Sequence, residues 1–424
     1  MFDTTQRKPD YPLLTIIGIL VPVGLVMVYS ASFVDAFTNH GSQLYYAWRQ
    51  LGGAIVGIIG LLIAQRLDYR FWRKYSVHLM GATLLLLLLV LVLPASITEV
   101  NGARSWIRLG GWFSMQPSEI AKLALVVYFA DWLSRRGTKL GNVSYGLIPF
   151  AVTLGVVAGL VIMEHDLGTT VVLVLIAGLI YFAAGANVLH IVGAAMLAGG
   201  AFWAMVKVAA YRQDRIAAWI DPFAHYQGAG YQPVHALYAL GSGGLFGEGL
   251  GQARQKFQWL PQAHTDAIFA IIGEEFGLLG ALFIVGCFLF IAYRGFRIAG
   301  RAPDPFAALL ATGLTAWLVF QAIINIAVVT TLLPFTGLTL PFISYGSTSL
   351  VMCLVAVGIL LNISRHTVDR PKAERIDVVQ IARRRGPSFG DTVRLWWRNR
   401  RPRLSGNRSR RSTAVNRVRN TRRR

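Results

Sequence analysis

The sequence predicts an all-α, polytopic membrane protein of about ten transmembrane helices, with its N- and C-termini in the cytoplasm. Charged residues make up only 14% of the 424 residues, whereas a typical soluble domain has about 25%. Apolar runs of about 20 residues, the length that crosses a bilayer as a helix, recur through the first 366 positions. Basic residues gather in alternate connections between these runs, and this pattern sets the orientation.

Ten helices are predicted from the apolar runs. They cover residues 12–32, 50–67, 75–94, 118–134, 144–163, 168–185, 188–208, 267–292, 305–330 and 346–364. The first could be mistaken for a signal peptide, because Arg7 and Lys8 precede it and Ser30-Ala31-Ser32 resembles a cleavage site. Its apolar stretch is long for a signal peptide and further spans follow, so it is expected to be retained.

The distribution of Lys and Arg predicts which connections face the cytoplasm. With a cytoplasmic N-terminus, the clusters of basic residues all fall on the inner side: Arg7 and Lys8; Arg66, Arg70, Arg73 and Lys74; Arg135, Arg136 and Lys139; Arg294, Arg297 and Arg301; and the C-terminal segment. The short outer connections 33–48, 164–167 and 331–345 hold no Lys or Arg. Basic residues favour the cytoplasmic side, so ten spans place both termini there.

Two predicted outer segments, 95–117 and 209–266, are long and rich in aromatic residues and glycine. The second, which forms a large outer loop between the seventh and eighth helices, contains the glycine-rich stretch 241–251. This stretch lacks the Gly-Lys-Ser/Thr ending of a phosphate-binding loop, so tight turns and close backbone approach are the preferred interpretation. Segment 331–345 is apolar but interrupted by Pro334, Gly337 and Pro341. It is expected to dip back against the protein and line an outer-facing cavity.

The net charge of +21 belongs mainly to the C-terminal segment, because 20 Lys and Arg stand against 4 Asp and Glu from Arg365 onward. Such an Arg-rich segment is typical of a disordered tail, so the chain is expected to divide into a membrane domain, 1–366, and a cytoplasmic tail, 367–424. The stretch Leu395-Trp396-Trp397-Arg398 could rest on anionic membrane lipid; a solvated tail that helps to fix the topology is the alternative. No nucleic-acid-binding fold accompanies the charge, so nucleic acid is not an expected partner.

Ionisable residues beside membrane helices are costly and are therefore candidates for function. His264-Thr265-Asp266 precedes the eighth predicted helix, and Glu274 and Glu275 lie within that helix. Asp266 could instead only cap the helix, a role that Asp favours. The two glutamates lie too far inside the helix for that explanation.

Two further outer positions carry acidic residues. Gln116-Pro117-Ser118-Glu119 opens the fourth helix, and Lys122 lies three residues after Glu119, so the two charges share a helix face and could form a purely structural ion pair. Glu164-His165-Asp166 forms the turn between the fifth and sixth helices. Asp166 could likewise be only a helix cap.

Basic residues also occur in the outer segments, namely Arg104, Arg108, Arg212, Arg215, Arg254 and Lys256. Such residues can bind an anionic headgroup, although long loops cross the membrane whatever their charge. No zinc-ligand spacing, nucleophile elbow or Cys/His pair is present in the sequence. A carboxylate with basic neighbours would suit general-base activation of a hydroxyl, with cations stabilising a departing diphosphate. A transporter with coupling carboxylates is the alternative that these residues leave open.

Five stretches, in order, resemble the SEDS family of shape, elongation, division and sporulation proteins (FtsW, RodA and SpoVE). The longest is 256–266, Lys-Phe-Gln-Trp-Leu-Pro-Gln-Ala-His-Thr-Asp, followed by 268–275, Ile-Phe-Ala-Ile-Ile-Gly-Glu-Glu. The others are Asn-Gly-Ala-Arg at 101–104, Gln-Pro-Ser-Glu at 116–119, Asp-Leu-Gly-Thr at 166–169 and Leu-Pro-Phe-Ile-Ser-Tyr-Gly at 340–346. The resemblance covers about residues 11–366.

The resemblance implies a peptidoglycan glycosyltransferase that polymerises lipid II, an undecaprenyl-diphosphate-linked disaccharide peptide, on the outer face of the cytoplasmic membrane. It implies a class B penicillin-binding protein, a transpeptidase, as a partner, together with other division proteins and membrane lipid. No cofactor is expected from it, and a divalent cation, Mg²⁺ or Mn²⁺, is left open. Residues 24–32 and 261–264 are more similar to the division branch of the family than to the elongation branch.

The resemblance also implies roles for individual residues. Asp266 corresponds to the family's catalytic carboxylate, which takes the proton of the acceptor sugar's hydroxyl as that hydroxyl attacks the donor's anomeric carbon. Glu119 and Lys122 are expected to position the substrate, and Arg104 to contact a phosphate. Asp166, Lys256 and His264 complete the expected substrate-binding residues.

The sequence departs from the family pattern at a few positions. Ala267 follows Asp266 where the family usually has Phe, His165 stands where Pro is common, and Ser347-Thr348 replaces the common Gly-Ser. These changes leave the carboxylates in place and bear on substrate geometry. Two other functions stay open at this point. One is a lipid II flippase, which would not need Asp266 as a proton acceptor, and the other is a non-catalytic scaffold for the transpeptidase.

Overall fold

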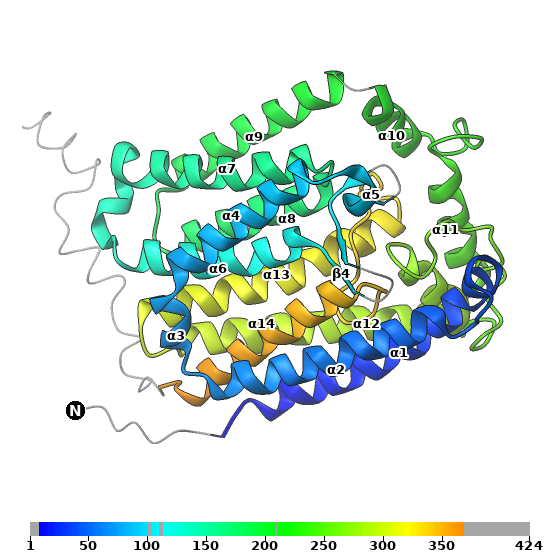
Figure 1. Ribbon diagram of the computed structural model, residues 1–424, viewed down its shortest axis with the longest axis horizontal. Helices are drawn as coiled ribbons and strands as arrows, with labels where there is room; N and C mark the ends of the chain where they lie inside the picture. Colours follow the sequence, from blue (N-terminus) through cyan, green and yellow to red (C-terminus); the bar gives the residue numbers. More distant parts are fainter. Residues whose placement is uncertain (1–7, 101–102, 110–112, 209, 369–424) are drawn as a thin grey trace, which may run out of the picture. The chain divides into compact units, whose positions relative to one another are not determined.

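The computed structural model describes residues 8–100, 103–109, 113–208 and 210–368, and a helix corresponds to each of the ten predicted spans. They lie side by side (Figure 1) and are α1 (Tyr11–His40), α2 (Tyr45–Arg66), α4 (Ser76–Val92), α6 (Pro117–Ser134), α7 (Ile148–Met163), α8 (Leu167–Ala183), α9 (Val188–Val208), α12 (Ile268–Gly300), α13 (Pro305–Val329) and α14 (Ser347–Arg365). Six of the described helices are long and apolar enough to cross a membrane, and two more, α4 and α8, are shorter and apolar. The chain is therefore a multi-pass membrane protein. The predicted tail lies outside the described residues from position 369 onward.

Short elements connect the long helices. At one end of the bundle lie α5 (Ala95–Thr98), α10 (Ala210–Ile220) and α11 (Tyr231–Ser242), as Figure 1 shows; this end is called the loop end. At the other end, the terminal end, lies α3 (Tyr69–Lys74). A 3₁₀ turn (Gly137–Gly141) and a π turn (Val143–Leu147) lead into α7.

The predicted outer segment 95–117 also contains two small antiparallel hairpins, which the all-α prediction did not include. In the first, β1 (Glu99–Val100) pairs with β2 (Ala103–Arg104), so that Glu99 lies opposite Arg104. In the second, β3 (Ile107–Leu109) pairs with β4 (Phe113–Met115). These hairpins bring the chain to the start of α6.

Several helices begin where a side-chain carboxylate caps the first turn. Asp10 accepts a hydrogen bond from the Leu13 amide at the start of α1, and Asp304 accepts one from the Ala307 amide at the start of α13. Each of these helices has Pro in its first turn, where the missing N–H costs nothing. The helix boundaries therefore follow from local sequence.

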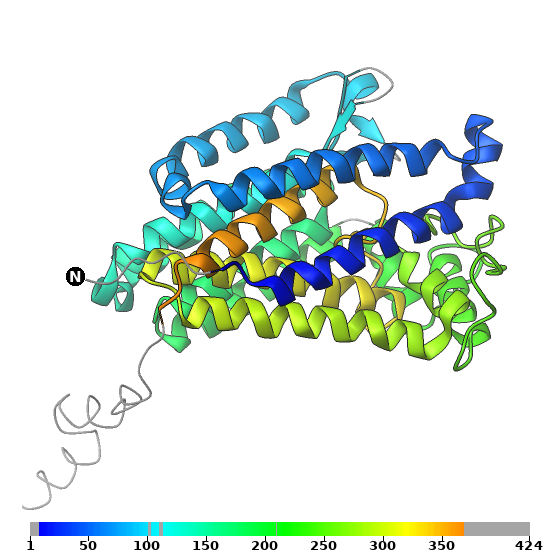
Figure 2. The ribbon, with the colours of Figure 1, turned by 90° about the horizontal axis from the view of Figure 1, so that it is seen from below.

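Helix α13 is the most enclosed of the long apolar helices, because 83% of its apolar window is buried. It packs against α12, α8, α6 and α14. On another side of the bundle α14 runs alongside α2 (Figure 2). Gly57 of α2 and Gly358 of α14 allow this close contact, since a Cβ at either position would lie within 2.5 Å of an atom of the facing helix.

Helix α12 is interrupted at Gly277, whose φ of 65° and ψ of −165° are not helical. The glycine-rich stretch after α11 packs into this interruption: the amides of Leu278 and Leu279 donate to the carbonyls of Gly244 and Leu245, and the amide of Glu248 donates to the carbonyl of Glu274. A Cβ on Gly277 would lie 2.4 Å from the amide nitrogen of Gly247. The glycines therefore serve close backbone approach, as predicted.

At the terminal end, polar contacts join helices that are far apart in the sequence. Arg294 of α12 forms an ion pair of 2.6 Å with Asp10 before α1. The Tyr69 hydroxyl donates to Asp304 at 2.6 Å, and its amide donates to the Asn362 side chain at 2.9 Å. These contacts fix the ends of α1, α3, α12, α13 and α14 against one another.

The interruption of α12 gives a testable prediction. Gly277→Ala should destabilise the protein by at least about 1–3 kcal/mol, because the new Cβ meets the backbone of Gly247 and the residue keeps a left-handed φ. Thermal unfolding in detergent measures the effect. The matched control is Gly286→Ala on the same helix, where a Cβ has open space. Equal melting temperatures for the two variants would contradict the packing described here.

Candidate active site

Asp266 lies at the loop end, two residues before α12, and its side chain is buried. One carboxylate oxygen accepts a hydrogen bond from the Thr265 hydroxyl at 3.2 Å, and the other accepts a long one from the Gln232 side chain at 3.5 Å. The residue at the cap of α12 is Ala267, and no side chain caps the helix. The helix-cap interpretation of Asp266 is therefore wrong, and its carboxylate is left for another role.

The surroundings of Asp266 adjust its acidity. Burial raises the pKa of this carboxyl from 3.8 to about 6, against the opposing effects of hydrogen bonds, among them those from Thr265 and Gln232, and of the positive charge of Arg215. A carboxylate with a pKa near the working pH is suited to accept a proton and to release it again. The acidity of Asp266 is thus compatible with proton exchange near neutral pH.

Arg215 borders the open space of this region. A pocket of about 700 Å³ is lined by Asp214, Arg215 and residues 223–229, between α10 and α11. Arg215 also lines a much smaller pocket with Trp219, Pro334 and Phe335. The exposed Arg215 guanidinium donates to the Phe335 carbonyl at 3.3 Å. An anion in the larger pocket would therefore meet a positive charge that also acts on Asp266.

The irregular segment 331–345 packs against the protein, as the sequence predicted. Its residues Leu338, Leu340, Phe342 and Ile343 are buried. Its first residues, Thr331 and 333–335, line the smaller pocket beside Arg215. The backbone of its buried part is paired with side chains of α13, so the segment is held at a fixed depth.

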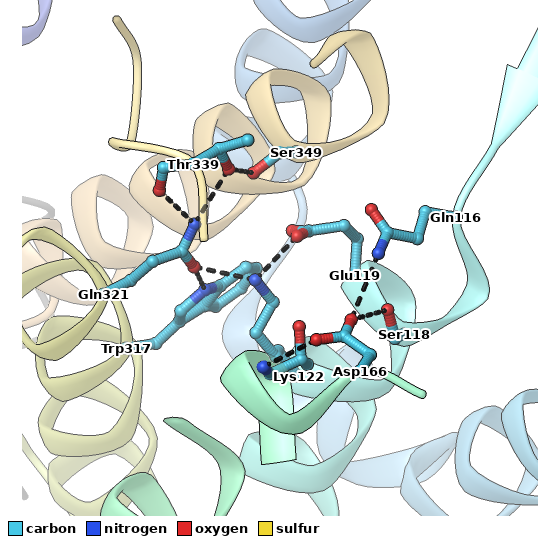
Figure 3. A network of polar contacts seen from close by, with 10 residues as sticks. Gln116, Ser118, Glu119, Lys122, Asp166, Trp317, Gln321, Thr339 and Ser349 are labelled. Carbon is cyan, nitrogen blue, oxygen red and sulfur yellow. Dashed lines mark hydrogen bonds and ion pairs between the residues drawn. The ribbon is translucent and has the colours of Figure 1, made fainter. Parts of the chain in front are cut away.

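Glu119 and Lys122 form the buried ion pair that their spacing allowed, with 2.8 Å between carboxylate and ammonium (Figure 3). The Lys122 ammonium also donates to the Gln321 side-chain oxygen at 2.7 Å, and the Trp317 indole donates to the same oxygen at 2.9 Å. The Lys122 side chain is completely buried. Both charges are therefore committed to contacts within the protein.

Two amides of α13 connect this ion pair to Asp266. The Gln321 amide nitrogen donates to the Thr339 carbonyl at 2.9 Å. One turn later, the Asn325 amide nitrogen donates to the carbonyls of Asp266 at 2.8 Å and Leu338 at 2.7 Å. The sequence analysis missed Gln321 and Asn325. The signal was available, since two amides four residues apart in an apolar span are unusual and share a helix face.

Asp166 does what the alternative interpretation proposed. Its carboxylate caps α8 by accepting the Thr169 amide at 2.9 Å. It also accepts hydrogen bonds from Gln116 at 3.2 Å and Ser118 at 3.3 Å, which ties the start of α6 to the start of α8 (Figure 3). Nearby Glu164 is fully buried and has no hydrogen-bond partner for its side chain among the described residues. Burial, with the charge of Asp166, raises the pKa of Glu164 to about 9, so this carboxyl is neutral.

Lys256 lies in a second buried ion pair. Its ammonium is 2.8 Å from Glu275 of α12 and 3.1 Å from the Ser30 hydroxyl of α1. The neighbouring Glu274 accepts hydrogen bonds from the backbone amides of Arg254 and Gln255. The two glutamates thus anchor the loop that leads to Asp266, which explains why they lie so far inside an apolar helix.

His264 and Arg104 are placed very differently from one another. His264 is buried against the rings of Tyr46 and Tyr345, with centroids 4.4 and 5.6 Å away. Burial lowers the pKa of His264 to about 4, so its ring is neutral at physiological pH. Arg104 lies on β2 with its side chain 48% exposed and 3.9 Å from Glu99. Of its expected motif, Asn101 and Gly102 lie outside the described residues.

The structure therefore joins Glu119, Lys122 and Asp266 through α13 and keeps Lys256 in a separate ion pair. His264 lies two residues before Asp266 in the chain, but its ring contacts a different group of residues. Among the residues described, no three His, Cys, Asp or Glu side chains are grouped as metal ligands.

Comparisons with known proteins agree with one another. Residues 11–369 match the family model of the cell cycle proteins FtsW, RodA and SpoVE. The chain is 42% identical over 364 residues to the probable peptidoglycan glycosyltransferase FtsW of Trichlorobacter lovleyi, covering 84% of this chain and 95% of the relative.

Solved structures show the same fold. One is a chain from a peptidoglycan synthase complex that coordinates polymerization and crosslinking, with a TM-score of 0.70 and 27% identity, over 85% of this chain and 99% of that chain. Another is an aspartate-to-alanine mutant of the rod shape determining protein RodA of Thermus thermophilus. It has a TM-score of 0.63 and 28% identity, over 85% of this chain and 99% of that chain.

The buried ion pair gives a prediction about stability. Lys122→Met should destabilise the protein by about 3–5 kcal/mol, because it leaves the Glu119 carboxylate buried without its cation. The double variant Glu119→Gln/Lys122→Met removes both charges and should recover a large part of the lost stability. Thermal unfolding of the three proteins in detergent measures this difference. A double variant as unstable as the single one would show that the pair is not self-compensating.

Proposed function

The chain belongs to the family of the cell cycle proteins FtsW, RodA and SpoVE, and on this premise we propose how it acts as a peptidoglycan glycosyltransferase. The observation that carries the proposal is the buried Asp266 carboxylate, whose pKa is about 6. The positive charge of Arg215, which lies at the edge of a large pocket, acts on this carboxylate. A base with a cation near it is what glycosyl transfer from a diphosphate requires.

In the proposed reaction, Asp266 accepts the proton of the acceptor sugar's hydroxyl. The oxygen of that hydroxyl forms a bond to the anomeric carbon of the donor, lipid II, while the bond from this carbon to the diphosphate oxygen breaks. The bond electrons leave with undecaprenyl diphosphate. The proton on Asp266 is then released to water, which restores the base for the next addition to the glycan strand.

We assign the contact with the departing diphosphate to Arg215. Negative charge grows on the leaving oxygen, and a guanidinium is suited to stabilise it through paired hydrogen bonds. Lys122 and Lys256 are buried in ion pairs with Glu119 and Glu275. We therefore assign these four residues to positioning: one pair holds α6 against α13, and the other holds the loop that carries Asp266.

The cellular setting is part of the same proposal. The basic clusters at the terminal end favour a cytoplasmic location for that end, which supports an outer location for Asp266 and the large pocket at the cytoplasmic membrane. A class B penicillin-binding protein is the proposed partner. The similarity to a chain of a synthase complex for polymerization and crosslinking supports it. The likeness to an FtsW relative supports a role in cell division.

The central experiment compares glycan-strand formation from purified lipid II by the wild type and Asp266→Asn, each with the transpeptidase partner. Asn keeps the shape but cannot accept the proton, so the rate should fall by about 10²–10⁴-fold. Glu248→Gln, an exposed carboxyl in the same outer segment, is the control and should keep full activity. Equal rates for the wild type and Asp266→Asn would overturn the assignment. No polymer from any folded, partner-bound protein would instead favour a flippase or scaffold.

The pH dependence follows from the raised pKa of Asp266. The ionised carboxylate is the base, so the rate should be full well above pH 6 and should fall as the pH drops through about 6. Thr265→Val removes a hydrogen bond that favours the ionised form, so it should raise this pKa and move the acidic limb to higher pH. A polymerisation rate that does not change between about pH 5 and about pH 8 would contradict the role of Asp266.

A further inference from the structure

At the terminal end, far from Asp266 along the helices, a second pocket of about 210 Å³ is lined by basic residues. Lys8 lies just before α1, and Arg294, Arg297 and Arg301 lie at the end of α12. Asp10 is the one carboxylate in the lining. The reaction proposed above uses none of these residues, so the pocket needs an explanation of its own.

The charge of this pocket favours an anion. The Asp10 carboxylate accepts three hydrogen bonds from Arg294, at 2.6, 3.1 and 3.1 Å, so this carboxylate is already neutralised by one cation. Four cations therefore line a pocket that contains one carboxylate. Guanidinium and ammonium groups gathered in this way are suited to bind phosphate oxygens.

The position of the pocket indicates a lipid rather than a soluble anion. It lies where α1 begins and α12 ends, which is the depth at which membrane-crossing helices meet the lipid headgroups. Two aromatic side chains flank it: Tyr11 lines the pocket and is 54% exposed, and Tyr293 is 58% exposed and accepts a hydrogen bond from Arg297 at 3.3 Å. Exposed Tyr side chains are typical of the headgroup region.

We propose that this pocket binds the headgroup phosphate of an anionic phospholipid. On the proposed orientation the terminal end faces the cytoplasm, and basic pockets between membrane helices on that side bind anionic headgroups. The sequence adds to the attraction, because the segment that follows α14 carries 19 Lys and Arg against 4 Asp and Glu from His366 onward. The phosphodiester lies between Lys8 and Arg297, and the acyl chains follow the apolar surfaces of α1 and α12 into the bilayer.

The test uses the full-length protein purified in a neutral detergent, with ligand binding followed by native mass spectrometry. The ligands are short-chain phosphatidylglycerol, short-chain phosphatidylcholine and inorganic phosphate. The pocket variant is Lys8→Gln/Arg297→Gln, which leaves the Arg294–Asp10 pair intact. The control is Arg66→Gln/Arg70→Gln, which removes two exposed charges at the same end of the bundle. Thermal unfolding checks that both variants are folded.

The proposal predicts that phosphatidylglycerol binds more tightly than phosphatidylcholine or phosphate. The pocket variant should lose on the order of tenfold in that affinity, while the control variant should keep it. Equal losses in the two variants would show only a general effect of surface charge and would overturn the site. Phosphate binding as tightly as phosphatidylglycerol would overturn the assignment to lipid. These outcomes do not depend on whether the chain polymerises lipid II.

Discussion

Inside a membrane-embedded helix bundle there is no bulk water, so a buried donor or acceptor needs a partner within the protein. Gln321 and Asn325 of α13 meet this requirement for backbone that is not helical. They donate to the carbonyls of Thr339, Leu338 and Asp266, which belong to the segment after α13 and the loop before α12. Because these carbonyls have no helical partner of their own, the two amides decide where both segments lie. The position of the Asp266 carboxylate therefore depends on α13.

The same requirement explains why some charged side chains at the loop end are buried as ion pairs, whereas Asp266 and Arg215 are not paired with each other. Glu119 with Lys122, and Glu275 with Lys256, are buried as ion pairs, and each pair is neutral as a whole. They hold α6 and the loop before Asp266 in place, and a buried charge that has lost its partner would be costly. Among the described residues, Asp266 and Arg215 do not form an ion pair with each other. Arg215 borders open space, where an incoming substrate can meet it, and its positive charge also acts on the buried Asp266.

At the terminal end, too, one ion pair joins two helices, but basic residues outnumber acidic ones around it. Arg294 and Asp10 form one close pair that joins α12 to α1, while the other basic residues around it remain in excess over acidic ones. A membrane protein can tolerate such an excess where anionic headgroups balance it. The two ends of the bundle would thus use phosphate in different ways, as a leaving group at the loop end and as a bound headgroup at the terminal end.

The sequence predicted the ten helices well, because length and apolar content alone determine which segments can cross a bilayer. It could not decide between cap and functional residue at Asp166 and Asp266, since each precedes an apolar run. The difference lies in the backbone: α8 begins one residue after Asp166, whereas α12 begins two residues after Asp266. The interruption at Gly277 was also beyond the sequence, because it depends on contact with the backbone of a glycine-rich stretch some 30 residues earlier.

The amides of Gln321 and Asn325 are visible in the sequence, but they are uncharged, so the rule that ionisable groups in membrane helices indicate function does not select them. For Lys256 the sequence identifies the residue but not its ion pair, because its partner Glu275 lies on another element, α12. Which cations are paired and which are accessible depends on tertiary contacts, and no spacing rule along the chain provides them.

The measurement that tests this account most directly is an infrared titration of the Asp266 carboxyl, taken as the difference between the wild type and Asp266→Asn. The account predicts a carboxyl that titrates near pH 6, at the same pH as the acidic limb of polymerisation. A carboxyl that stays ionised well below that pH, or that titrates without any change in polymerisation, would contradict the claim that Asp266 is the base.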